Sequence, residues 1–145
     1  TKYLCITLVV LEHISLEDIW IYMGEIFNQM VTVFNKLGNV NPTPIKFKNG
    51  KNSKFSGKVS SNLGTSVINL GILHYDWNRS IGVDKINQAI QQTEQAGLDG
   101  TLMVANQFSK SAIEQVYRIN SSTTKRIFLY ETEEIEAAYQ LISVN

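Results

Sequence analysis

Residues 82–145 restrict the fold most, because helical and extended patterns alternate there. Residues 101–105 (TLMVA) and 126–130 (RIFLY) are short apolar runs, which are typical of strands buried on both faces. One helical pattern separates these runs and another follows the second. Strands joined through a single helix run parallel, with a right-handed crossover. This half therefore predicts an α/β domain that contains a parallel βαβ unit.

The helices of this half are marked by their end signals. An apolar stripe begins at Val83 and its helix ends at Gly97, a residue that commonly follows a last helical turn. Ser109 is the predicted N-cap of a helix that reaches about Ile119, and Thr132 is the predicted N-cap of the final helix.

The first half predicts a strand, a long helix and an antiparallel meander. Residues 3–11 are a continuous apolar run, predicted as a buried strand, although so short a run also fits a helix. Apolar residues recur at helical spacing between the N-cap Ser15 and the terminator Gly38. The meander is predicted from three extended stretches and two turns, at residues 45–47, 54–60 and 65–75, with turns at Asn49-Gly50 and 62–64.

Composition fits one domain that covers residues 1–145, with 43% hydrophobic residues and room for one core. The chain begins at Thr1 rather than Met, so we expect it to be part of a larger protein. Its single cysteine, Cys5, lies in the first apolar run and predicts a buried thiol in an intracellular, reducing compartment. That run is too short to span a bilayer, and no signal peptide is visible.

The order of helix, three-stranded meander, helix, strand, helix and strand resembles the restriction-endonuclease-like fold of the PD-(D/E)xK superfamily. The C-terminal half is similar to its Mrr-like branch, through "SIGVDKINQAIQ", "GLDGTLMVA", "FSKSAIEQ" and "RIFLYETEEIEAAYQLI". These segments match an entry to a helix, a turn into a strand, a capped helix, and a closing strand and helix. The resemblance implies a central mixed sheet with helices on both faces.

The resemblance also implies where a metal would be held. Members hold Mg²⁺ with an Asp near the middle strand of the meander and a Glu or Gln two residues before a Lys on the next strand, because Mg²⁺ prefers oxygen ligands. Counted back from Gly82, the Lys position falls on Tyr75 and the Glu or Gln position on Leu73. The middle strand offers Phe55, Ser56 and Gly57. Residues 26–75 contain no Asp or Glu, so we predict no catalytic residues, no metal site and no cofactor.

The same stretch without carboxylates contains lysines in an otherwise neutral protein of formal net charge +0. They could contact phosphates or an acidic partner, or simply keep an exposed hairpin solvated, which we favour. A neutral chain also lacks the overall basic charge of non-specific nucleic-acid binders. The candidate contact residues are Lys46, Lys48, Lys51, Lys54 and Lys58.

Two further groups of residues are candidates for function. His74, Asp76 and Arg79 form a polar cluster, in which His74 and Asp76 are two apart on a strand and so share a face. Structural hydrogen bonding is the favoured interpretation, since no third metal ligand is identifiable. Trp20 and Tyr22 add aromatic residues beyond one narrow stripe of the first helix, which indicates a protein interface unless the core covers them.

Together these features predict a non-catalytic, nuclease-like interaction or assembly module within a larger protein or complex. The expected partner is a protein or a second copy of the chain. The alternative is a nucleic-acid-binding or nuclease subunit with a degenerate or displaced metal site; nucleic acid is therefore a second, less favoured partner.

Overall fold

A computed structural model describes residues 25–41 and 55–144 of the chain. The predicted strand at residues 3–11 and the beginning of the predicted first helix lie outside the described residues. The described elements, in chain order, are α3 (Glu25–Phe34), β1 (Asn39–Asn41), β2 (Gly57–Leu63), β3 (Ser66–Tyr75), α4 (Val83–Ala96), β4 (Gly100–Ala105), α5 (Lys110–Ser122), β5 (Arg126–Glu131) and α6 (Thr132–Val144).

The described strands form one mixed sheet in the order β1-β2-β3-β4-β5. The pairs β1-β2 and β2-β3 are antiparallel, while β3-β4 and β4-β5 are parallel. This arrangement confirms the predicted antiparallel meander and the parallel βαβ half. None of the helices in the described stretches is long and apolar enough to cross a membrane.

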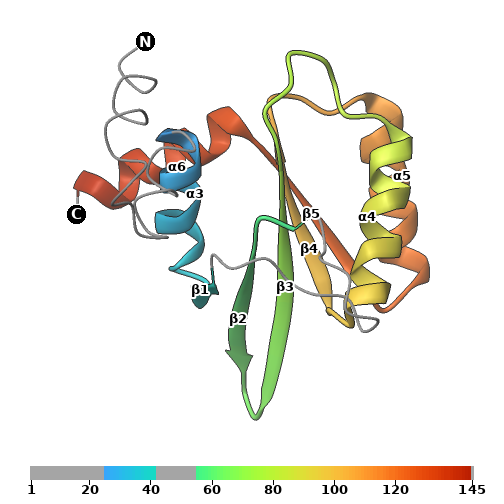
Figure 1. Cartoon of the computed structure of the whole chain (residues 1–145), viewed down its shortest axis with the longest axis horizontal. Helices are drawn as coiled ribbons and strands as arrows, with labels where there is room; N and C mark the ends of the chain where they lie inside the picture. Colours follow the sequence, from blue (N-terminus) through green and yellow to red (C-terminus); the bar gives the residue numbers. More distant parts are fainter. Residues whose placement is uncertain (1–24, 42–54, 145) are drawn as a thin grey trace, which may run out of the picture.

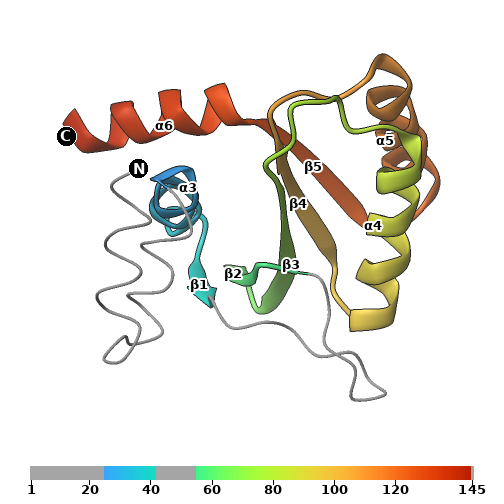
Figure 2. The same ribbon diagram turned by 45° about the horizontal axis from the view of Figure 1, so that its top comes forward.

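Helices cover both faces of the sheet, as Figures 1 and 2 show: α4 and α5 lie on one face, α3 and α6 on the other. Alternation along β3 sends Leu73 toward α4 and α5 and Ile72 toward α3 and α6. The α4/α5-side core consists of Phe55, Leu73, Ile81, Ile86, Ala89, Leu98, Met103, Ala105, Ala112, Val116, Ile119 and Ile127. The α3/α6-side core consists of Phe27, Met30, Phe34, Val59, Ile72, Leu102, Val104 and Ile135.

The described part of the meander begins with a strand that the sequence did not predict. It is β1, whose residues Asn39–Asn41 pair with Ser60, Val59 and Lys58 of β2. A three-residue segment with one apolar residue, Val40, is too short to show a strand pattern in the sequence, so its pairing with β2 is what identifies it. The strand predicted at residues 54–60 begins later, at Gly57, and continues to Leu63. Residues 45–47 and the predicted Asn49-Gly50 turn lie outside the described part of the chain.

The turn between β2 and β3 is confirmed with a small shift. Leu63 pairs with Ser66, which leaves Gly64 and Thr65 as a two-residue loop. Gly64 has a φ of 63°, and glycine at the first loop position is the arrangement of a type II′ hairpin turn. The right-handed twist of the two strands favours this turn.

The helix ends in the second half follow the predicted signals at two of three places. The Oγ of Ser109 accepts from the N–H of Ala112 at 3.1 Å, so it is the predicted N-cap, and Gly97 closes α4 in the left-handed conformation. Thr132 was wrongly predicted as an N-cap, because α6 already begins there and its hydroxyl donates to Oδ1 of Asn106 at 2.6 Å.

The second predicted buried strand is an edge strand. β4 is buried along its whole length because sheet and helices surround it. β5 pairs only with β4 among the described strands, and its Phe128 is 40% exposed. Apolar composition predicted burial on both faces, but the place of a strand in the sheet depends on pairing that the composition does not encode.

A buried threonine pair between α4 and β4 gives a test of the core. Thr93 and Thr101 are both 0% exposed, and their hydroxyl oxygens are hydrogen-bonded. The Thr93 hydroxyl donates to the carbonyl of Ala89 at 2.6 Å, so the Thr101 hydroxyl donates to Thr93. Thr101 would therefore lose its acceptor if Thr93 were replaced.

We expect Thr93→Val to lower the free energy of unfolding by about 2 kcal/mol, since it leaves a buried O–H without a partner. The double variant Thr93→Val, Thr101→Val should recover most of that loss, because removing both polar groups is close to neutral. Urea unfolding measures all three proteins. A double variant less stable than the single one would show that the pair is not the source of the effect.

Candidate functional site

The two metal positions that the resemblance assigns on β3, Leu73 and Tyr75, lie on the same side of the sheet as Phe55, the first of the three residues offered near the middle strand. The N–H of Ser56 donates to the carbonyl of Ile72 at 2.7 Å, which holds the start of β2 beside the end of β3. Phe55 and Leu73 belong to the α4/α5-side core and are 3% and 2% exposed. Tyr75 packs against the same core. The three side chains therefore fill this place with hydrocarbon and a phenol.

Phe55 fills its position by packing over a glycine of β3. A Cβ added to Gly71 would lie 2.5 Å from Cε1 of Phe55 and 2.9 Å from Cδ1 of Leu98. Such separations are shorter than real carbon contacts, so the absence of a side chain at residue 71 lets the aromatic ring lie against the strand. The ring of Phe55 therefore occupies the space directly over Gly71.

Tyr75 lies two residues after Leu73 in β3 and packs against the same core. Its ring lies 5.2 Å from the ring of Trp77 in a T-shaped arrangement. Burial raises the pKa of the Tyr75 phenol, so the group stays protonated at neutral pH. A neutral phenol is a poor ligand for Mg²⁺, which prefers carboxylates and water.

Across residues 25–41 and 55–144, no three His, Cys, Asp or Glu side chains are grouped in a way that could hold a metal ion. Residues 26–75 contain no Asp or Glu. This observation concerns only metal ligands that side chains of the described residues would supply.

The structure does not bring all three residues of the predicted polar cluster together. His74 lies toward α3, with its ring 6.4 Å from that of Phe27. Burial lowers the pKa of His74, and the nearby charge of Asp76 raises it to a smaller extent. Arg79 instead lies over the Trp77 ring at 4.7 Å, a cation–π contact outside the sheet. The structure thus brings His74 and Asp76 together and leaves Arg79 apart.

The remaining predicted contact residues are only partly described. Lys58 lies in β2, half-buried, and pairs with Gly71 in the sheet register. Trp20, Tyr22 and four of the five candidate lysines lie outside the described residues, namely Lys46, Lys48, Lys51 and Lys54.

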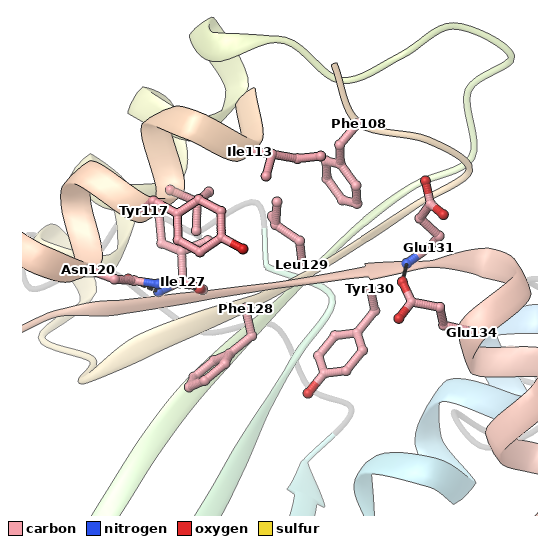
Figure 3. A pocket seen from close by; sticks show the side chains of 11 residues that line it. Phe108, Ile113, Tyr117, Asn120, Ile127, Phe128, Leu129, Tyr130, Glu131 and Glu134 are labelled. Atoms are coloured by element: carbon pink, nitrogen blue, oxygen red, sulfur yellow. Dashed lines mark hydrogen bonds between the residues drawn. The ribbon is translucent and has the colours of Figure 1, made fainter. Parts of the chain in front are cut away.

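A hollow at the free edge of β5 was not predicted from the sequence. It has a volume of about 480 Å³ and is bounded by β5, α5 and the beginning of α6 (Figure 3). Three of its apolar side chains are well exposed: Ile113 at 41%, Tyr117 at 71% and Phe128 at 40%. The lining residues are Phe108, Ile113, Val116, Tyr117, Asn120, Ile127, Phe128, Leu129, Tyr130, Glu131 and Glu134. We call this surface the β5 groove.

Side chains bond three of the outward backbone groups of β5. Oδ1 of Asn120 accepts from the N–H of Ile127 at 2.9 Å, and Nδ2 of Asn120 donates to the carbonyl of Ile127 at 3.0 Å. Directly before α6, the N–H of Glu131 donates to Oε1 of Glu134 at 2.9 Å. Alternation makes the N–H and C=O of Leu129, between these two positions, face the same outward side.

A comparison with solved structures finds the same arrangement of strands and helices in "DNA modification-dependent restriction endonuclease AspBHI". The match has a TM-score of 0.54, 14% sequence identity, and covers 81% of this chain. The described domain has a restriction-endonuclease-like fold. The chain spans 30% of that endonuclease, so the match concerns the fold of this domain and not the activity of the longer protein. No protein-family model matches the restriction-endonuclease-like domain, and no curated protein matches it significantly.

Proposed function

We propose that this restriction-endonuclease-like domain is a non-catalytic interaction or assembly module within a larger protein or complex. The observation that carries the proposal is that Leu73 and Tyr75 occupy the two metal positions assigned on β3, and that Phe55, one of the three residues offered near the middle strand, packs into the same α4/α5-side core. The Mrr-like likeness of residues 82–145 supports the alignment that selects these positions.

The chemistry of phosphodiester cleavage explains why this filling matters. A nuclease of this type needs a divalent metal to lower the pKa of the attacking water and to neutralise charge on the phosphate. The metal in turn needs oxygen ligands and room for water molecules. Buried phenylalanine and leucine supply neither, and the Tyr75 hydroxyl keeps its proton. What the fold still offers is a rigid scaffold with surfaces for other molecules.

We expect the purified protein to show no cleavage of DNA in Mg²⁺ or Mn²⁺ above a no-protein control. Duplexes with and without modified bases should both be tested, because the similar solved structure is described as modification-dependent. The matched variants are Asp76→Asn, beside His74, and Asp84→Asn, an exposed carboxylate of α4. Metal-dependent cutting that Asp76→Asn abolishes and Asp84→Asn preserves would contradict the proposal and indicate a displaced site.

A second candidate function is nucleic-acid binding without cleavage. It is favoured by the lysines of the stretch that has no carboxylates and by the DNA-related name of the similar structure. Phosphate contacts would make binding steeply dependent on salt, at a log-log slope of about −0.9 for each neutralised phosphate of duplex DNA.

We expect labelled duplex to bind weakly at moderate salt and with no dependence on these lysines, since the acidic beginning of α6 repels a polyanion. The measurement is a titration at two salt concentrations. It compares the natural sequence with a variant in which Lys46, Lys48, Lys51, Lys54 and Lys58 are all replaced by Gln. Tight, salt-steep binding that the variant loses would promote this second function over the first.

A further inference from the structure

The β5 groove combines apolar exposure with an accessible strand edge. Ile113 and Tyr117 of α5 lie on the same side of β5 as Leu129, whereas Phe128 points to the opposite side of the strand; all of them line the hollow at this edge (Figure 3). Scattered exposed apolar residues are common on proteins, whereas several around one concave site indicate a surface that another molecule covers.

The hydrogen bonds that β5 already makes at its outer edge determine how the backbone of a partner can pair with this strand. Ile127 and Glu131 have outward groups that already bond to Asn120 and Glu134. No side chain in the described ranges bonds the outward N–H and C=O of Leu129. An added strand can therefore form one pair of backbone hydrogen bonds, at Leu129, without displacing a native bond. This suits a short extended segment better than a long strand.

A second copy of the chain is a poorer occupant. An antiparallel pair of two β5 strands about a two-fold axis at Leu129 would place Ile127 opposite Glu131 of the second copy. The hydrogen bonds that the Asn120 and Glu134 side chains make to the β5 backbone would have to break. Side chains at strand edges commonly prevent this kind of pairing between identical chains.

The charged residues that line the groove indicate which kind of molecule can bind there. Among the residues that line the groove, the charged ones are Glu131 and Glu134, both at the α6 end. Figure 3 shows these two side chains at the same end of the hollow. Covering them with an apolar molecule would desolvate carboxylates without compensation, and a nucleic acid would bring like charge. A positively charged side chain of the partner at that end would offset the cost of desolvating these two carboxylates.

We propose that the β5 groove binds a short extended peptide segment of a partner protein, with alternating apolar residues and a Lys or Arg beside Glu131 and Glu134. The central residue pairs with Leu129, its side chain lies among Ile113, Tyr117 and Leu129, and the basic residue lies two positions away. This proposal rests on the interaction role proposed above and names the class of partner.

The test is selection from a phage library of random heptapeptides on the full chain, in buffer with EDTA. EDTA removes divalent metal ions, so peptide binding is measured without any contribution from a metal site. If the protein cleaved DNA in the separate cleavage assay, the proposed function would be contradicted, but this peptide-binding test would be unaffected. We expect enriched peptides with apolar residues at alternate positions and a Lys or Arg at one end. Binding of the best peptide should weaken about tenfold on N-methylation of its central residue, which blocks the bond to Leu129.

Variants of the protein provide matched controls. Tyr117→Ser should weaken binding about tenfold without changing the melting temperature, because the side chain is 71% exposed. Leu63→Ser, an equally exposed change at the β2-β3 hairpin, should have no effect. Glu131→Gln with Glu134→Gln keeps the oxygen that accepts from Glu131 N–H and removes the charge, so it should weaken Lys-containing peptides and not their norleucine counterparts.

Three results would overturn the proposal. One is a library that yields no peptide whose binding depends on Tyr117. Another is a dimer in solution that Tyr117→Ser dissociates, which would assign the groove to a second copy. The third is DNA-induced change in the NMR signals of Leu129 and Phe128, which would assign it to nucleic acid.

Discussion

Replacing Phe55 by alanine is expected to lower the free energy of unfolding by about 3 to 4 kcal/mol, near the top of the range for single core changes. The side chain is 3% exposed and lies against Gly71, Leu98 and the α4/α5-side core. Its loss removes a large buried apolar area and leaves a cavity that the glycine cannot fill. Urea unfolding, followed by circular dichroism, measures the change.

The control for this experiment is Phe128→Ala, which removes the same group from a side chain that is 40% exposed. We expect this variant to lose about 1 kcal/mol or less, since most of its surface change occurs in water. If Phe55→Ala cost no more than Phe128→Ala, residue 55 would not be a core position, and its packing with Leu73 and Tyr75 in the α4/α5-side core would be wrong.

Gly71→Ala is expected to lower the free energy of unfolding by about 2 to 3 kcal/mol. The new methyl group would lie closer to Phe55 and Leu98 than carbon atoms can approach without a clash. Both side chains are buried, so they cannot move away freely. The backbone conformation at this position does not cause the effect, because Gly71 lies in a regular strand and its φ is not positive.

The same change should be almost harmless when Phe55 is already alanine, because the cavity then accepts the methyl group. A double-mutant cycle with Phe55→Ala and Gly71→Ala should therefore give a favourable coupling of about 2 kcal/mol between the two changes. Additive losses would mean that Gly71 is required for a reason other than the ring of Phe55.

Local signals in the sequence predicted the second half of the fold well. Helix α4 ends at Gly97 and α5 begins at the Ser109 cap, as their end signals indicated, because these residues act through bonds within the same turn. The edge position of β5 and the existence of β1 depend on which strands pair across the sheet. An apolar run such as RIFLY and a polar one such as Asn39–Asn41 do not encode that choice.

The candidate sites show the same division between local and tertiary information. The apolar character of Leu73 and Tyr75 could be read from the sequence, but their packing with Phe55 on one face requires the β2-β3 register. The β5 groove was missed because RIFLY predicted burial on both faces. The available signal was the aromatic residue Phe128 beside Arg126 and Glu131, since charged residues at both ends of a strand are typical of an edge.

The central claim is the proposal that Leu73 and Tyr75, with Phe55 packed on the same side of the sheet, occupy the positions where a nuclease would bind its metal, and that the protein binds no metal there. Titration of the isotope-labelled protein with Mn²⁺ tests this directly, because the ion broadens the NMR signals of amides close to it. The account predicts that the amides of Ser56, Leu73 and Tyr75 broaden no more than those of exposed residues remote from them, such as Leu63. Selective broadening of these three amides at stoichiometric Mn²⁺ would contradict it.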